Sequence, residues 1–203
     1  MKHWFLAALA LVCTWALGQA PAANPTQRLR GTIESFDGST LVVKERSGEV
    51  LRLALANSLS LSEVLPIELS AIQPGSFIGT AAMPAADGTL RAMEVLVFPE
   101  AARGTGEGHS PWDLQPGSTM TNATVADVVA VAGVSEGRLL KLRYKDGEKT
   151  LDVPVGTPVV TFRPGDRSLL VAGAKVLVTA QLRDGTPTAL RVLAGRNGFA
   201  PPM

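Results

Sequence analysis

Apolar and polar residues alternate along short stretches of the chain, and glycine-containing turns separate these stretches. The clearest alternating or apolar runs cover residues 29–36, 41–44 and 50–55, and the turn sequences Asp37-Gly38 and 46–49 lie between them. Alternation with a period of two gives a strand one buried and one exposed face, and glycine-containing turns reverse the chain direction. The pattern therefore predicts consecutive β-hairpins.

The first half of the chain continues with a less regular segment and then two further strands. Residues 58–69 predict either a short helix before Pro66 or a loop. The apolar runs at 77–82 and 90–98 predict strands. Together these features predict an all-β unit over residues 29–98.

The second half repeats the order of the first. The pair Gly48-Glu49 returns as Gly147-Glu148, 99 residues later, and the triplet Asp-Gly-Thr at 87–89 returns at 184–186, 97 residues later. Two markers with nearly the same offset indicate duplication of one unit. The second copy is predicted to cover residues 123–195.

Each unit has about 70 residues and five or six short strands, which favours a small barrel because closure removes exposed strand edges. The predicted fold class is all-β, with two tandem small OB-like β-barrels and room for a short helix in the first. Residues 99–122 are expected to form an ordered connector containing glycine and proline, and residues 196–203 a disordered tail.

Several of these positions resemble a family of exported bacterial proteins of unknown function that have small OB-like β-barrels. The matching pattern places Gly31, Ile33 and Asp37-Gly38 at the start, and a Pro-Gly turn and an Asp-Gly-Thr turn follow. The resemblance covers 29–98 well and 123–195 more loosely, since Ala123 replaces the first glycine. It implies a fold and no catalytic residues.

Residues 1–22 have the features of a cleavable signal peptide. Lys2 precedes an apolar run at 5–17, and a small-x-small sequence predicts cleavage before Ala23. An uncleaved N-terminal anchor is the alternative, and Val12 before Cys13 is a poor context for lipidation. The expected product is located in the periplasm or secreted, with no transmembrane segment after signal removal.

The mature chain would contain 18 basic and 18 acidic residues and no cysteine. A neutral balance and few aromatic residues argue against a nucleic acid partner. Without cysteine, disulfides, thiolate metal sites and a cysteine nucleophile are excluded. The expected partner is an unknown envelope protein or a small ligand, and no cofactor is predicted.

The connector holds the only histidine and tryptophan of the mature chain, His109 and Trp112. Because a tryptophan in a connector usually packs on something, the candidate site for a ligand or partner combines these two residues with Glu107 and Asp113. A metal role is the alternative for His109, with Met120 as a second weak ligand for copper. A structural role in an ordered loop remains the simplest interpretation of His109.

Arginines recur between apolar positions on the predicted strands, for example Arg28, Arg30 and Arg191. They predict solvated barrel faces, with a groove for an anionic glycan or lipid as the alternative. Ser110 near His109 does not make a nucleophile set, because a triad is defined by geometry and no nucleophile elbow is present.

These observations favour a non-enzymatic, exported binding or assembly module of the cell envelope with an unknown ligand. The alternative is an exported, copper-type metal-handling protein that uses His109 and methionines. A hydrolase of unknown type is the third interpretation.

Overall fold

The computed structural model describes residues 24–130 and 137–202, so the predicted signal peptide lies outside the described residues. Over these ranges the chain forms β-strands and short 3-10 turns and contains no α-helix. The strands are β1 (Thr26–Phe36), β2 (Thr40–Glu45), β3 (Val50–Pro66), β4 (Phe77–Pro84), β5 (Leu90–Ala92), β6 (Val95–Val97), β7 (Gly108–Pro111), β8 (Thr119–Ala130), β9 (Arg138–Tyr144), β10 (Gly147–Val153), β11 (Val159–Pro164), β12 (Lys175–Arg183) and β13 (Thr186–Gly195). The 3-10 turns are η1 (Leu69–Ala71), η2 (Glu100–Ala102) and η3 (Arg167–Leu169). The prediction of an all-β chain is confirmed.

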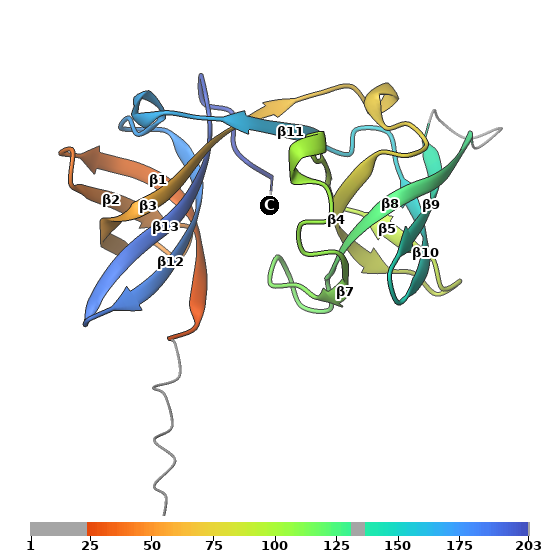
Figure 1. Cartoon of the computed structure of the whole chain (residues 1–203), viewed down its shortest axis with the longest axis horizontal. Coiled ribbons are helices and arrows are strands. Elements are labelled where there is room, and N and C mark those ends of the chain that lie inside the picture. The colour runs from red at the N-terminus through yellow and green to blue at the C-terminus, as the bar shows by residue number, and fades with distance from the viewer. Residues whose placement is uncertain (1–23, 131–136, 203) are drawn as a thin grey trace, which may run out of the picture.

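Five strands close a barrel, the left-hand lobe of Figure 1. β1 pairs with β12 and β2, β2 pairs with β3, and β13 pairs with both β12 and β3. The inward positions are apolar, as alternation requires, and Ile33, Leu53 and Val178 lie buried in its core. On β1, Gly31 approaches β2 so closely that a Cβ there would overlap the carbonyl of Lys44, so this position requires glycine.

A second lobe, the right-hand one in Figure 1, consists of β8, β9, β10, β5 and β4. These strands pair in that order, β10 with β5 in parallel and the others antiparallel, and β4 also pairs with β8. Its core is separate from that of the barrel and includes Ile78, Val125 and Leu140. β7 pairs with the first residues of β8.

Long strands join the two lobes across the top of the view in Figure 1. β3 has 17 residues, which at about 3.3 Å per residue span up to roughly 55 Å, far more than one small barrel needs. Its second half pairs with β11, which in turn pairs with β6. A third apolar cluster, which includes Val64, Val160 and Leu193, fills the junction.

The junction also contains an ion-pair network in which a buried carboxylate meets two partly exposed arginines. The carboxylate of Glu63 on β3 lies 3.0 Å from the Arg163 guanidinium and 3.1 Å from that of Arg196. Burial opposes ionisation of this carboxyl, but hydrogen bonds and charge from the two arginines hold its pKa below the usual value. Glu63 therefore ties β11 and the C-terminal segment to β3.

The barrel is not built from one sequence unit, contrary to the expectation that residues 29–98 and 123–195 would form tandem barrels. It takes β1, β2 and β3 from the first unit and β12 and β13 from the second. The second lobe takes β4 and β5 from the first unit and β8, β9 and β10 from the second. The physical reason is the length of β3, which carries the chain out of the barrel before β4 begins.

Contacts at equivalent positions of the two lobes recur. In the barrel, Ile33 N–H donates to the carbonyl of Ala174 at 2.9 Å, and in the second lobe Val125 N–H donates to the carbonyl of Ser76 at 2.8 Å. The strand register shifts directly after Ile33 in β1 and directly after Val125 in β8. The two lobes thus share local details as well as the order of strand contacts.

Two local expectations differ from the structure. Residues 58–66 belong to β3, and only the 3-10 turn η1 follows Pro66, so over residues 58–66 both the helix and the loop alternatives are wrong. The serine–leucine alternation at 58–62 was already a strand pattern. Residues 196–202, expected to form a disordered tail, pack against the body through Phe199 and the buried Pro201.

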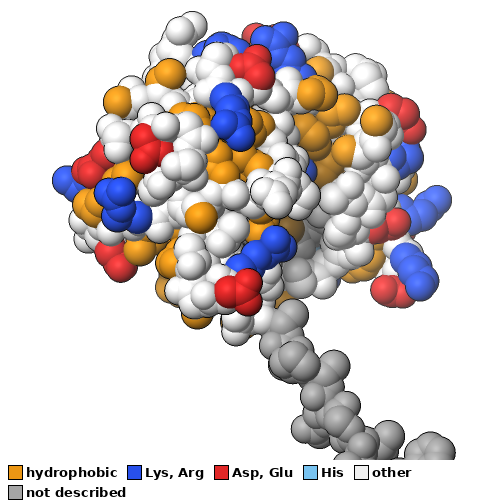
Figure 2. Space-filling view, turned by 60° about the vertical axis from the view of Figure 1, so that its left-hand side comes forward, with side chains coloured by type: hydrophobic (Ala, Val, Ile, Leu, Met, Phe, Trp, Pro, Cys, Tyr) orange, Lys and Arg blue, Asp and Glu red, His pale blue; other side chains and the backbone are white. Residues whose placement is uncertain are grey.

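Basic and acidic side chains are scattered among hydrophobic ones on the face in Figure 2, as the formal net charge of +1 suggests. Among the described residues, no helical segment is long and apolar enough to cross a membrane.

Candidate functional site

The connector over residues 99–122 forms a strap with fixed contacts. The guanidinium of Arg103 pairs with the Glu100 carboxylate and donates to the Gly75 carbonyl oxygen at 2.9 Å. Further along, the side-chain amide of Asn122 donates to the Thr105 carbonyl oxygen at 3.0 Å. Between these points β7 pairs with β8. The strap is therefore held against the second lobe on both sides of its glycine-rich part.

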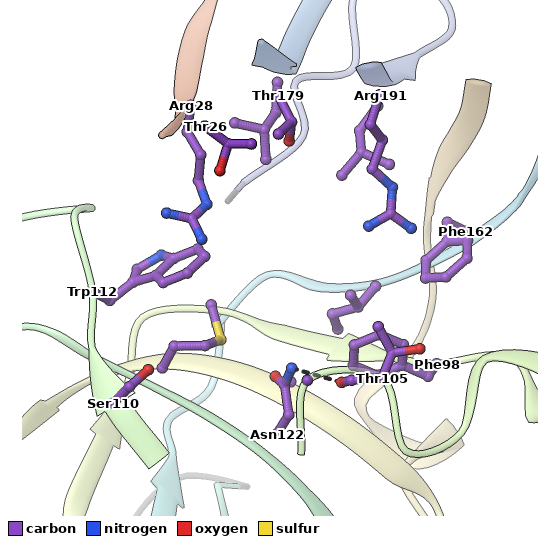
Figure 3. A pocket seen from close by; sticks show the side chains of 16 residues that line it. Thr26, Arg28, Phe98, Thr105, Ser110, Trp112, Asn122, Phe162, Thr179 and Arg191 are labelled. Atoms are coloured by element: carbon purple, nitrogen blue, oxygen red, sulfur yellow. Dashed lines mark hydrogen bonds between the residues drawn. The ribbon is translucent and has the colours of Figure 1, made fainter. Parts of the chain in front are cut away.

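A cavity of about 350 Å³ lies where the barrel, the second lobe and the strap meet (Figure 3). Its size is at the lower end of the range for small-molecule sites, about 300–1,000 Å³. Other hollows of similar volume lie on the barrel surface, but here side chains from both lobes and the strap converge. The cavity lining combines an apolar set with polar groups: Leu96, Phe98, Trp112, Met120, Phe162, Leu177 and Leu193, with Thr26, Arg28, Thr105, Ser110, Asn122, Thr179 and Arg191.

Trp112 and Asp113 connect the strap to the barrel. The Arg28 guanidinium lies over the Trp112 ring, 4.1 Å from its centroid. Asp113 pairs with Arg30 at 2.8 Å and with Arg28 at 3.6 Å. Partial burial opposes ionisation of Asp113, but the hydrogen bond and charge of Arg30, and then the charge of Arg28, hold its pKa below the usual value. The two predicted residues thus meet arginines of β1.

Arg191 of β13 enters the cavity from the barrel, as Arg28 does. Its guanidinium extends into the open space in Figure 3 and lies 5.9 Å from the centroid of the Phe162 ring. Its Nε is buried without a hydrogen-bond partner among the described residues, and the same holds for Nε1 of Trp112. Both are donors, and both are closed off from solvent.

A carboxyl group is buried close to Arg30. The Glu94 side chain, between β5 and β6, is 2 % exposed, and its Oε2 has no hydrogen-bond partner among the described residues. Burial raises the pKa of Glu94 to about 8, and the charge of Arg30 opposes this shift only in part. Near pH 7 this carboxyl is therefore mostly protonated and does not neutralise Arg30.

The other two predicted site residues lie away from the cavity. Nδ1 of His109 lies 2.8 Å from Oγ1 of Thr121, and its ring stacks with that of Tyr144 at 6.4 Å. Burial and then the charge of Lys149 lower the pKa of His109. Glu107 accepts a hydrogen bond from the Lys145 backbone N–H at 3.1 Å. Both residues fasten the strap to the second lobe.

The structure does not bring the two weak metal ligands together. In the β7–β8 pairing His109 lies opposite Thr121, and Met120 lies opposite Ser110. Because side chains alternate along a strand, His109 and Met120 point to opposite faces, and Met120 lines the cavity. Within residues 24–130 and 137–202, no three His, Cys, Asp or Glu side chains cluster to hold a metal ion. The copper alternative stays a prediction that no geometry here favours.

Sequence reasoning placed the arginines of the site on solvated faces. Arg28 and Arg191 instead line the cavity, and the Arg30 side chain is only 12 % exposed. They occupy outward positions of barrel strands, where alternation predicts exposure. The arrangement agrees better with the alternative of a groove for an anionic ligand. The only sequence signal for such a groove was the recurrence of arginine at outward strand positions.

No family model, curated protein or solved structure matches this chain. The family resemblance that begins at Gly31 therefore stays a prediction, and the function has to be argued from the cavity.

Proposed function

We propose that this protein is an exported, non-catalytic binding module of the cell envelope, and that a small ligand binds in the cavity between the barrel and the second lobe. The observation that carries the proposal is the convergence of Arg28, Arg191 and Trp112 on one cavity of about 350 Å³. A concave, largely apolar site with a few convergent polar groups is typical of ligand binding. The leader-like residues 1–22 support export.

The chemistry of the cavity wall supports binding over catalysis. Among the described residues that line it there are hydroxyls, amides and guanidiniums but no carboxylate and no imidazole. A hydroxyl nucleophile needs a base within hydrogen-bond reach. The hydroxyl of Ser110 lines the cavity, whereas His109 lies on the other face of the same strand and bonds Thr121.

We also infer that the architecture is a duplicated OB-like unit whose copies exchange strands. Supporting this, each lobe repeats one order of strand contacts with a single parallel pairing, β3 with β13 in one and β10 with β5 in the other. Because of this exchange, residues from both copies line the space between the lobes. A ligand site there would respond to the relative position of the two lobes.

A filled-cavity variant tests the proposed function. Thr179 lies on the cavity wall, so Thr179→Trp should occupy the space, whereas Thr186→Trp at the exposed start of β13 is a matched control. Mature protein is incubated with a small-molecule extract of bacterial envelopes, washed and analysed by mass spectrometry. We expect a compound retained by wild type and Thr186→Trp and lost from Thr179→Trp. Equal retention by all three proteins would refute a ligand seat in this cavity.

An activity screen tests the non-catalytic part separately. We expect mature protein to turn over none of a panel of ester, glycoside and peptide substrates. Turnover that disappears in His109→Ala would contradict the proposal, because it would give His109 a chemical role.

A further inference from the structure

The charges around the cavity are unbalanced. Three guanidiniums, those of Arg28, Arg30 and Arg191, lie at or beside it, whereas the only ionised carboxylate paired with any of them in the described structure belongs to Asp113. Asp113 is shared between Arg28 and Arg30, and no salt bridge of Arg191 is found among the described residues. The cavity therefore has an excess of positive charge on the side of Arg191.

The guanidinium of Arg191 offers hydrogen-bond donors to the cavity. Its Nε, like Nε1 of Trp112, has no partner in the described part of the chain, but both of these atoms are closed off from solvent. The end of the guanidinium extends into the open space in Figure 3, and its nitrogens are donors only. A ligand that supplies acceptors at this point is therefore favoured.

Another part of the wall is apolar and aromatic. Phe98 and Phe162 meet edge to face with ring centroids 5.9 Å apart, and Leu177 and Leu193 of the barrel lie in the same wall. The Arg191 guanidinium is already positioned by the Phe162 ring, which reduces the cost of ordering it when a ligand binds. A cavity of about 350 Å³ accommodates a body of one or two rings.

We infer that the ligand carries a carboxylate-like anionic group on an apolar, aromatic body, with the anionic group paired to Arg191 and the body against Phe98, Phe162 and Trp112. Guanidinium binds planar oxyanions through two parallel hydrogen bonds, which gives the site its preference for such a group. This inference rests on the proposed ligand seat and specifies its chemistry.

A pair of probes with the same shape and different charge tests it. The sodium salt of 2-naphthoic acid and the neutral 2-naphthamide are titrated into mature protein by isothermal titration calorimetry. We expect naphthoate to bind at least roughly tenfold more tightly than the amide, because a charge-assisted hydrogen bond is about twice as strong as a neutral one. The difference should shrink as salt is added.

Variants at one position locate the charge. Arg191→Met should remove the preference for naphthoate, Arg191→Lys should keep part of it, and Arg52→Met, on the exposed outer face of β3, should leave it unchanged. Circular dichroism confirms that each variant is folded. Equal binding of the two probes, or an unchanged preference in Arg191→Met, would overturn the assignment.

The two proposals fail in different ways. If an envelope compound is lost from Thr179→Trp but naphthoate binds no better than its amide, the ligand seat stands and the anionic class is wrong. If Thr179→Trp retains every compound and still binds naphthoate as wild type does, the seat itself is wrong. Decanoate that binds as tightly as naphthoate would overturn the aromatic body alone.

Discussion

Replacing Glu94 by glutamine should make the protein more stable near neutral pH. The carboxyl is buried, one of its oxygens has no partner in the described structure, and Arg30 compensates only part of the desolvation. Its pKa rises from an ordinary value near 4.5 to about 8. Glutamine has the same shape as the protonated acid and needs no proton to remain neutral.

The sign and size follow from proton linkage. Because the folded state holds the proton more tightly than the unfolded chain, the stabilisation from protonated Glu94 is complete below pH 4.5 and is lost as pH rises towards 8. At pH 7 the loss for a shift of this size is roughly 3 kcal/mol, taking about 1.36 kcal/mol per pKa unit. Glu94→Gln removes this dependence, so the variant should match wild type at low pH and exceed it at pH 7 by up to that amount.

Urea unfolding followed by far-ultraviolet circular dichroism at several pH values from 4.5 to 8.5 measures the effect. Glu148→Gln, at the exposed start of β10, serves as control and should keep the wild-type dependence on pH. Other carboxyls with lowered pKa values act below this window. The same fall in stability between pH 5 and 8 in Glu94→Gln as in wild type would refute the assignment of a buried, protonated carboxyl.

Three further predictions use other parts of the structure. Gly31→Ala should reduce the free energy of unfolding by roughly 1–3 kcal/mol, because its Cβ meets the neighbouring strand, and urea unfolding would show this loss. Glu63→Gln should lower stability at pH 7, with the difference from wild type closing as pH falls below 4.5 through the lowered folded pKa; a constant difference would contradict the ion pair model. Trp112→Ala should weaken naphthoate binding about tenfold, because the ligand loses an aromatic contact. His109→Ala should change the affinity less than about twofold, since His109 faces away from the cavity. Calorimetry with both variants separates these two roles of the strap.

Strands and turns were largely readable from the sequence, whereas their partners were not. Alternation and the glycine turns identify β1, β2 and β3 because these signals are local. Whether β3 returns into its own barrel or continues into the next lobe depends on contacts with β11, about 100 residues away. In the duplication proposed above, two copies of one unit offer equivalent partners for each strand, so the local pattern is the same for tandem and exchanged pairing.

The candidate site was recovered in part for the same reason. Trp112 and Asp113 stood out because the connector differs in composition from both units. Arg28 and Arg191 sit at outward strand positions, which face water in an isolated barrel and face the cavity once a second lobe packs against it. His109 was expected beside Trp112. In the pairing of β7 with β8, however, the His109 side chain points away from the cavity, whereas Trp112 lines it.

Because the barrel pairs strands from both halves of the chain, it can close only late in synthesis. Thr26 at the start of β1 lies opposite Gln181 of β12, a partner that leaves the ribosome only after nearly the whole chain has been made. A nascent chain therefore cannot finish the barrel early, and closing such a long loop slows the last step. If the protein is exported unfolded through a translocation channel, as proposed above, such late completion would keep the chain unfolded until its last strands are synthesised.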